Sequence, residues 1–222
     1  MSRGFGHIET WVFDLDNTLY PPSCRLFDQI HARMDEYVSR LLALSHAQAK
    51  VVRQRLFEQY GTTLTGLVRE HAIDAGGFLD HVHDLDYSPV QPSVALDRAL
   101  AKLPGRKLIF TNGTVPHAER VLARLGVAQH FADIFDIVLS GYVSKPDAGP
   151  YGVFVRRTGI DPKASAFFED IARNLEAPHD LGMTTVLVTS PDHPGARPVN
   201  GERPHFVHHV TDDLPGFLAT LR

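Results

Sequence analysis

The stretch that decides the fold is Trp11–Thr18, which reads WVFDLDNT. Its first three residues are apolar, and a short apolar run is typical of a strand buried on both faces of a sheet. Asp14 and Asp16 follow directly. Side chains at positions i and i+2 of an extended backbone point the same way, so both carboxylates can enter one pocket. The stretch therefore predicts a buried strand that opens into an acidic site.

Beyond this strand the chain alternates between strand and helix patterns. The expected strands are Lys107–Phe110, Phe135–Leu139, Ala164–Phe168, Thr185–Val188 and Phe206–Val210. The expected helices are Val94–Leu103, Pro116–Leu125, Tyr151–Thr158, Asn174–Leu181 and a last one from Asp213, and Pro191–Pro204 is expected to be an irregular loop. Repeated strand–helix units predict an α/β fold, a parallel sheet covered by helices on both faces in a Rossmann-like core.

One long helical region interrupts this alternation. From about Leu26 to His83 apolar residues recur at three- and four-residue spacing, with no strong strand pattern. Gly61 and the pair Gly76-Gly77 are expected to separate the helices. We therefore expect residues 1–20 and 92–222 to form an α/β core domain, and residues 21–91 to form an inserted, all-helical cap domain.

Polar residues also follow three of the later strands. These are Thr111-Asn112-Gly113, Lys145-Pro146 and Glu169-Asp170. Taken singly, they are explained as a turn, an exposed lysine and a charge pair at a helix N-terminus. In open α/β sheets, however, ligands bind at the carboxyl ends of the strands. Together with the acids after the first strand, these residues indicate one site.

Composition excludes several classes of partner. The chain has 222 residues and a formal net charge of −4, so a nucleic acid polymer or an anionic membrane is not expected to bind. No apolar run approaches the roughly 18 residues that span a bilayer, and the N-terminus lacks the apolar run of a secretory signal. A single cysteine, Cys24, fits a reducing compartment, and we expect a cytoplasmic protein. The oligomeric state is not indicated.

The four motifs, in this order, resemble those of the haloacid dehalogenase superfamily, whose first motif is D-x-D-x-T. The resemblance implies that Asp14 is a nucleophile that forms a phosphoaspartate, and that Asp16 is the general acid and base. It implies phosphate binding by Thr111, Asn112, Gly113 and Lys145. It also implies Mg²⁺ held by Asp14, Asp170 and the backbone carbonyl of Asp16, with Glu169 orienting a metal-bound water. Many relatives carry one more acid after the fourth motif, where this chain has Asn174.

Two further stretches are similar to the pyrimidine 5'-nucleotidase branch of that superfamily. They are Asp14–Pro21, DLDNTLYP, and Tyr60–Leu67, YGTTLTGL. The similarity implies a small phosphorylated substrate, a nucleoside 5'-monophosphate, with Tyr60, Thr63 and Arg69 facing it. A sugar-phosphate phosphatase and a phosphosugar mutase are the alternatives among enzymes. A dehalogenase is disfavoured because it has no use for an acid such as Asp16 or for magnesium.

A non-catalytic binding or regulatory module with the same fold is the alternative from another class. Such a module would be expected to have lost Asp14, Asp16 or Lys145, and this sequence retains all three.

Overall fold

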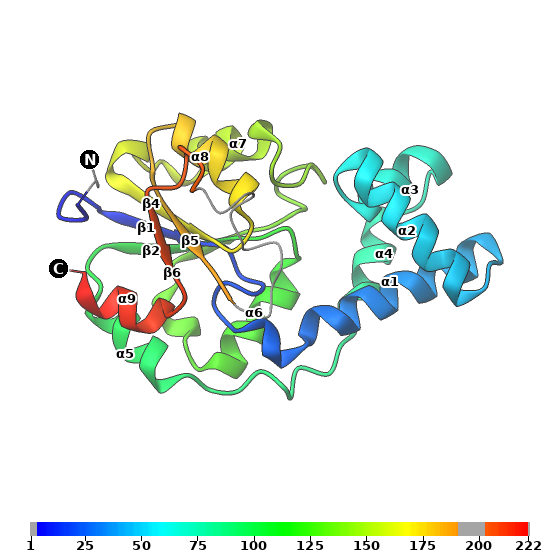
Figure 1. The fold of residues 1–222 in the computed structure, drawn as a ribbon, viewed down its shortest axis with the longest axis horizontal. Coiled ribbons are helices and arrows are strands. Elements are labelled where there is room, and N and C mark those ends of the chain that lie inside the picture. The colour runs from blue at the N-terminus through cyan, green and yellow to red at the C-terminus, as the bar shows by residue number, and fades with distance from the viewer. Residues whose placement is uncertain (1–3, 191–202, 222) are drawn as a thin grey trace.

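The computed structural model describes residues 4–190 and 203–221. Its centre is a six-stranded sheet with the order β3-β2-β1-β4-β5-β6, in which neighbouring strands are parallel (Figure 1). The strands are β1 Thr10–Phe13, β2 Arg106–Phe110, β3 Asp133–Phe135, β4 Ser165–Glu169, β5 Thr184–Val188 and β6 His209–Thr211. The predicted parallel α/β sheet is confirmed.

Helices cover both faces of this sheet, as predicted. All four residues of β1 are buried, with Trp11 and Phe13 in one apolar cluster and Val12 in the other. Residues of α5, α6 and α9 pack on the first face, and residues of α7 and α8 on the second (Figure 1). These helices are α5 Val94–Lys102, α6 Val115–Leu125, α7 Ala148–Thr158, α8 Glu176–Asp180 and α9 Leu214–Thr220.

The strand order reverses beside β1, and this reversal positions the site. The chain builds β1, β2 and β3 outward to one side, then crosses to β4 on the other side of β1. The connections after β1, β2 and β4 therefore diverge at neighbouring carboxyl ends, where open α/β sheets bind ligands. Asp14, Thr111 and Asp170 each directly follow one of these strands.

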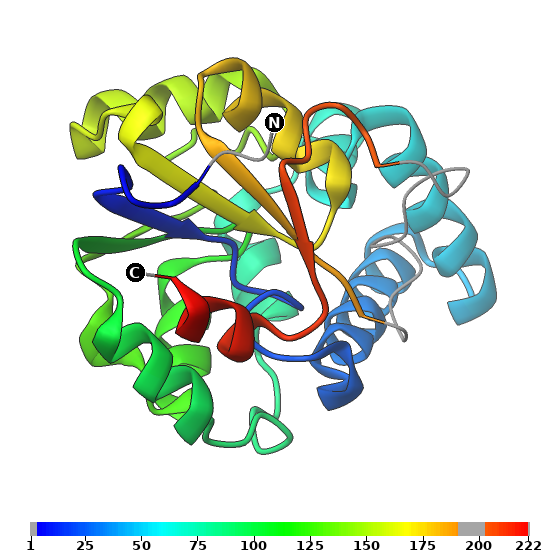
Figure 2. The same ribbon diagram turned by 60° about the vertical axis from the view of Figure 1, so that its left-hand side comes forward.

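The residues after β1 lead into a separate group of helices beyond the carboxyl ends of the strands (Figures 1 and 2). We call this group, Leu26–Val82, the helical insertion. It comprises α1 Leu26–Leu42, α2 His46–Tyr60, α3 Thr63–His71 and α4 Ala75–Val82. It has an apolar cluster of its own that includes Val38, Leu56, Leu67 and Phe78. Within residues 4–190 and 203–221, no helix has the length and apolarity needed to cross a membrane.

Two expected strands differ from prediction. β3 covers Asp133–Phe135 and ends where the expected strand Phe135–Leu139 begins, because the Asp136 carboxylate accepts the Leu139 and Val115 backbone N–H groups and starts a turn. β6 begins only at His209, because the Val207 N–H bonds the Pro204 carbonyl in a turn. Apolar residues in these turns are buried without being in a strand.

Helix boundaries also differ from prediction, and α7 begins at Ala148 rather than at Tyr151. Gly76 and Gly77 lie inside the first turn of α4, and the helix begins after Asp74, whose carboxylate accepts the Gly77 N–H at 2.8 Å. The helix expected from Asn174 starts at Glu176, after a 3₁₀ turn over Ala172–Leu175. The expected loop Pro191–Pro204 lies outside the described residues up to position 202.

Candidate active site

Lys145 is the centre of the site. Its Nζ donates to Asp14 Oδ1 at 2.6 Å, to Glu169 Oε2 at 2.7 Å and to the Phe110 carbonyl oxygen at 3.0 Å. All three side chains are buried, with Lys145 3% and Glu169 1% exposed. Burial opposes the charge of Lys145, but the charges of Asp14 and Glu169 outweigh burial and raise its pKa above the ordinary value. Lys145 therefore stays a cation that joins the loops after β1 and β4.

Asp14, Glu169 and Asp170 form a cluster of buried carboxylates whose ligand atoms lie within 4.8 Å of one another. Burial and the charge of Glu169 raise the pKa of Asp14 to about 7, although Lys145 opposes the rise. Burial, followed by the charges of Glu169 and Asp14, raises the pKa of Asp170 well above its ordinary value. Three carboxylates therefore face one ammonium group. This excess of negative charge, together with an all-oxygen donor set, suits a hard divalent cation.

The loop after β2 supports this network through its own hydrogen bonds. The Asn112 side chain accepts the Lys145 backbone N–H at 2.9 Å and donates to the Lys145 carbonyl oxygen at 3.3 Å. The Gly113 N–H donates to Thr111 Oγ1 at 2.9 Å. A Cβ on Gly113 would lie 2.9 Å from the His117 ring, so glycine is required by close packing. Asn112 and Gly113 line the cavity described below, and Thr111 is buried behind them.

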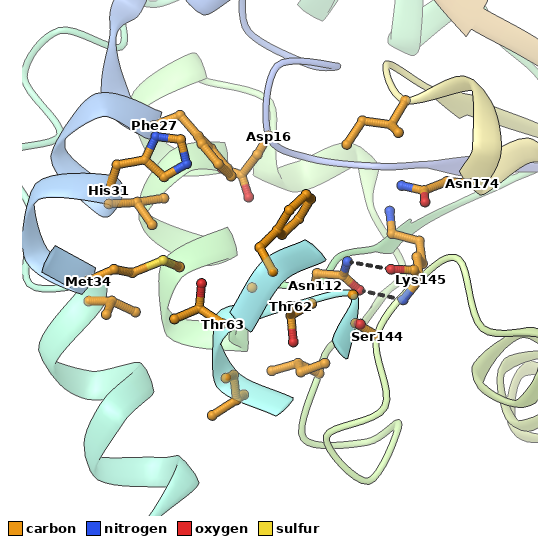
Figure 3. Close-up of a pocket in the computed structure, with 18 of the residues that line it drawn as sticks. Asp16, Phe27, His31, Met34, Thr62, Thr63, Asn112, Ser144, Lys145 and Asn174 are labelled. Carbon is orange, nitrogen blue, oxygen red and sulfur yellow. Dashed lines mark hydrogen bonds between the residues drawn. The ribbon is translucent and has the colours of Figure 1, made fainter. Parts of the chain in front are cut away.

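Asp16 points into the space between the sheet and the helical insertion (Figure 3). Its Oδ1 accepts the Tyr20 hydroxyl at 2.6 Å and lies 2.8 Å from His117 Nε2. Burial alone would raise the pKa of Asp16, but His117 and Tyr20 hold it below the ordinary value. Neither partner is part of the four motifs. In the sequence, Tyr20 lies four residues after Asp16, within the stretch Asp14–Pro21 quoted above. His117 lies four residues after Gly113, and this spacing is its only signal.

A cavity of about 770 Å³ extends from Asp16, Asn112 and Lys145 into the helical insertion (Figure 3). Its walls are mainly apolar and aromatic, with a few polar groups. The apolar lining includes Phe27, Ile30, Met34, Phe57, Phe78 and Phe206, and the polar lining includes His31, Arg53, Gln54, Thr62 and Thr63. Such a chamber is the size of typical small-molecule sites.

The three residues of the insertion that were expected to face the substrate do not lie together in the structure. Thr63 lines the cavity and is buried. Tyr60 and Arg69 are not in its lining. The Tyr60 hydroxyl instead donates to Glu70 at 2.9 Å, and the Arg69 guanidinium lies over the Tyr60 ring at 5.8 Å. Asn174 also lines the cavity; it is buried, and its Oδ1 has no hydrogen-bond partner among the described residues.

Comparison with known proteins decides the family. Residues 8–182 match the haloacid dehalogenase-like hydrolases. The chain belongs to this family. Among curated proteins, this haloacid dehalogenase-like hydrolase is 26% identical over 197 residues to Phosphate metabolism protein 8 of Saccharomyces cerevisiae, covering 81% of this chain. The chain spans about three-fifths, 61%, of the length of that relative.

Solved structures share the fold of this chain. An L-2-haloacid dehalogenase from Xanthobacter autotrophicus superposes with a TM-score of 0.58 at 16% identity, covering 97% of this chain and 100% of that one. A defluorinating L-2-haloacid dehalogenase superposes with a TM-score of 0.61 at 17% identity, covering 100% of this chain and 99% of that one. At these identities the likeness concerns the fold of this haloacid dehalogenase-like hydrolase and leaves its reaction to be argued from the site.

Proposed function

We propose that this protein is a magnesium-dependent phosphomonoesterase that works through a phosphoaspartate on Asp14. The observation that carries the proposal is the pairing of two differently held acids at one cavity. Asp14 is bound to the Lys145 ammonium, whereas Asp16, two residues on, lines the cavity and is bound by His117 and Tyr20. A nucleophile beside a cation and a separate proton carrier are the two functions that phosphate-ester hydrolysis requires.

The chain's own residues account for the proposed steps. Asp14 attacks phosphorus while Asp16 gives a proton to the leaving oxygen, and Asp16 then takes a proton from the water that releases phosphate. The Thr18 hydroxyl donates to Asp14 Oδ2 at 2.9 Å, and Lys145 holds Oδ1, so the attacking carboxylate is fixed on both oxygens. A fixed carboxylate and a fixed ammonium lower the cost of orienting charge around the transferring group.

The carboxylate cluster fits the proposed metal ion. Asp14, Asp170 and the backbone carbonyl of Asp16 would hold Mg²⁺, with Glu169 already engaged by Lys145 as a supporting residue. The buried Asn174 Oδ1, which has no hydrogen-bond partner within residues 4–190 and 203–221, is a candidate for supporting the same shell through water. When bound, the ion would offset the negative charge of the phosphate and of Asp14.

A nucleoside 5'-monophosphate is the substrate class that we favour, with pyrimidine nucleotides first. The cavity supports this proposal because its aromatic walls can cover a flat base, while Thr62, Thr63 and Gln54 offer hydrogen bonds to a base edge. A hexose phosphate carries hydroxyl groups on every side and would leave many of them unpaired against these walls. We further propose that residues 21–91 act as a cap domain that selects the leaving group for a core of residues 1–20 and 92–222.

A substrate panel tests both the phosphatase assignment and the nucleotide assignment. Phosphate release would be measured for uridine, cytidine and adenosine 5'-monophosphates, glucose 6-phosphate and phosphoglycolate, with chloride release from 2-chloropropionate as the test for dehalogenation. We expect the pyrimidine nucleotides to have the highest kcat/KM, by about tenfold to a hundredfold. A higher value for a sugar phosphate or phosphoglycolate would contradict the nucleotide assignment alone. Chloride release without phosphate release would contradict the phosphatase assignment.

A further inference from the structure

Two donors converge on one oxygen of Asp16. The Tyr20 hydroxyl and His117 Nε2 both reach Oδ1, at 2.6 and 2.8 Å. In the described part of the chain, no hydrogen bond to Oδ2 is formed. The two oxygens of this carboxyl group are therefore not equivalent, since one is held by the protein and the other is left available to the cavity that Asp16 lines.

His117 is itself held on every side. Its side chain is fully buried in the first turn of α6, and its ring stacks on His83 with centroids 4.5 Å apart and planes 19° from parallel. Its Nδ1 lies 3.0 Å from the Tyr87 hydroxyl, which also reaches the His83 carbonyl oxygen at 3.0 Å. The Tyr87 hydroxyl donates its one proton to the His83 carbonyl oxygen, so its oxygen accepts from His117 Nδ1–H. In its imidazolium form the His117 ring then also donates from Nε2 to Asp16.

The packing around His117 joins three segments of the chain. The absence of a side chain at Gly113 allows the ring to approach the phosphate-binding loop after β2. His83 directly follows the last residue of α4, and Tyr87 lies further along the connection from the insertion to α5. The ring has no exposed surface and is packed against His83 and Tyr87 of the connection and Gly113 of the loop after β2, so it has little rotational freedom. Its Nε2 is therefore a rigid donor.

We infer that His117 and Tyr20 are positioning residues that bind Oδ1 of Asp16 and thereby reserve Oδ2 for proton transfer. The inference rests on the proposed role of Asp16 as acid and base. His117 and Tyr20 favour ionised Asp16, so the inference requires Asp16 to take up a proton on Oδ2 before the first step. In that step the Oδ2–H proton passes to the leaving oxygen as its bond to phosphorus breaks and the bond from Asp14 forms. In the second step Oδ2 takes a proton from the attacking water as the Asp14–phosphorus bond breaks. Asp16 thus returns to its starting state.

Leaving-group dependence tests this inference. The variants His117→Leu and Tyr20→Phe each remove one donor, and kcat/KM would be measured for the best alkyl phosphate of the substrate panel and for p-nitrophenyl phosphate. The value of kcat/KM reports the steps up to formation of the phosphoenzyme. Because nitrophenolate leaves without a proton, only the alkyl ester needs Asp16 as an acid in these steps. We expect His117→Leu to lose about 10- to 100-fold on the alkyl ester and less than about threefold on p-nitrophenyl phosphate.

Two further variants sharpen the test. His117→Gln keeps an N–H donor and should recover most of the loss on the alkyl ester. His130→Leu is the matched control, because His130 Nε2 lies 2.7 Å from Asp97 in a similar pair that does not line the cavity. It should leave the ratio of the two kcat/KM values unchanged. Tyr20→Phe removes only a hydroxyl, so the experiment remains decisive even where His117→Leu fails to fold.

Equal losses on both esters in His117→Leu and Tyr20→Phe would overturn the inference. Asp16→Asn, measured in parallel, distinguishes this result from failure of the proposed function. If Asp16→Asn loses activity selectively on the alkyl ester while the other two variants do not, only the positioning role is wrong. If Asp16→Asn also loses activity equally on both esters, the acid role of Asp16 itself is wrong.

Discussion

The loops at the strand ends and the helical insertion differ in how their polar residues are used. At the strand ends, charged side chains from distant parts of the sequence meet in one buried network around Lys145. In the insertion, the polar residues around Tyr60 bond to one another outside the cavity, as Arg55 and Tyr60 do with Glu70. A parallel sheet brings the ends of its strands together by backbone pairing alone. In a helix, by contrast, packing decides which residues face the cavity. We therefore propose that the strand ends supply the chemistry and that the insertion supplies the selectivity.

The largest effect should come from the strand ends and should be the same for every substrate. Asp14→Asn should lower turnover by about 10³-fold or more, since it removes the nucleophile. Thermal melting should show that the variant still folds, and Asp180→Asn, at an exposed position of α8, serves as a control. Residual activity above about a hundredth of wild type, with unchanged melting, would refute the nucleophile assignment.

Removal of the metal should have the next largest effect. Activity should fall to background in excess EDTA and return with Mg²⁺, because three buried carboxylates face a single ammonium. Asp170→Asn should weaken Mg²⁺ activation by about 10- to 100-fold, the scale on which even supporting ligands matter. Titration of activity against free Mg²⁺ measures both the metal requirement of the wild type and the weaker activation of Asp170→Asn. Full activity in EDTA would contradict this prediction.

His83, at the junction of the two regions, should make stability depend on pH. Burial, followed by the charge of His117, lowers the pKa of His83 to about 3. Below pH 6.5 the unfolded chain therefore binds a proton that the folded chain does not, and stability is lost as the pH falls. Between pH 7 and 5 the wild type should lose about 2 kcal/mol more free energy of unfolding than His83→Gln. Denaturant titrations at both pH values measure this difference, and parallel losses would refute it.

The smallest effect should come from the cavity wall and should depend on the substrate. Thr63→Val removes a hydroxyl from the cavity and should lower kcat/KM for the preferred nucleotide about fivefold, with little change for p-nitrophenyl phosphate. Thr220→Val, at an exposed position of α9 outside the lining, is the control. Equal effects of Thr63→Val on both substrates would mean that the insertion serves closure and not recognition.

The sequence predicted the sheet and the meeting of the motif residues because both follow from order along the chain. Four motifs after four apolar strands had to meet once those strands became parallel neighbours, and Asp14, Lys145 and Glu169 do so. The short β3 was missed because the Asp136 carboxylate, which ends it, competes with strand pairing in a way that hydrophobic pattern does not reveal.

Partners within the site were harder to predict than the motifs. His117 looks like an ordinary residue of an amphipathic helix, and only the packing of α6 against Gly113 brings it to Asp16. The same limit applies to Tyr60, whose place beside Glu70 depends on how α2 and α3 cross. Tertiary packing decides such contacts, and helical periodicity alone leaves the direction of each residue open.

The central claim is that phosphate passes through Asp14, and trapping the intermediate tests it most directly. Wild-type protein with Mg²⁺ would be mixed with its best phosphate ester, quenched in acid within milliseconds, digested and examined by mass spectrometry. We expect one added phosphate on the peptide that contains Asp14, lost on treatment with hydroxylamine, as an acyl phosphate should be. Its accumulation should increase in Asp16→Asn if release of phosphate slows more than attack. Phosphate release with the added phosphate on a residue other than Asp14 would contradict the account.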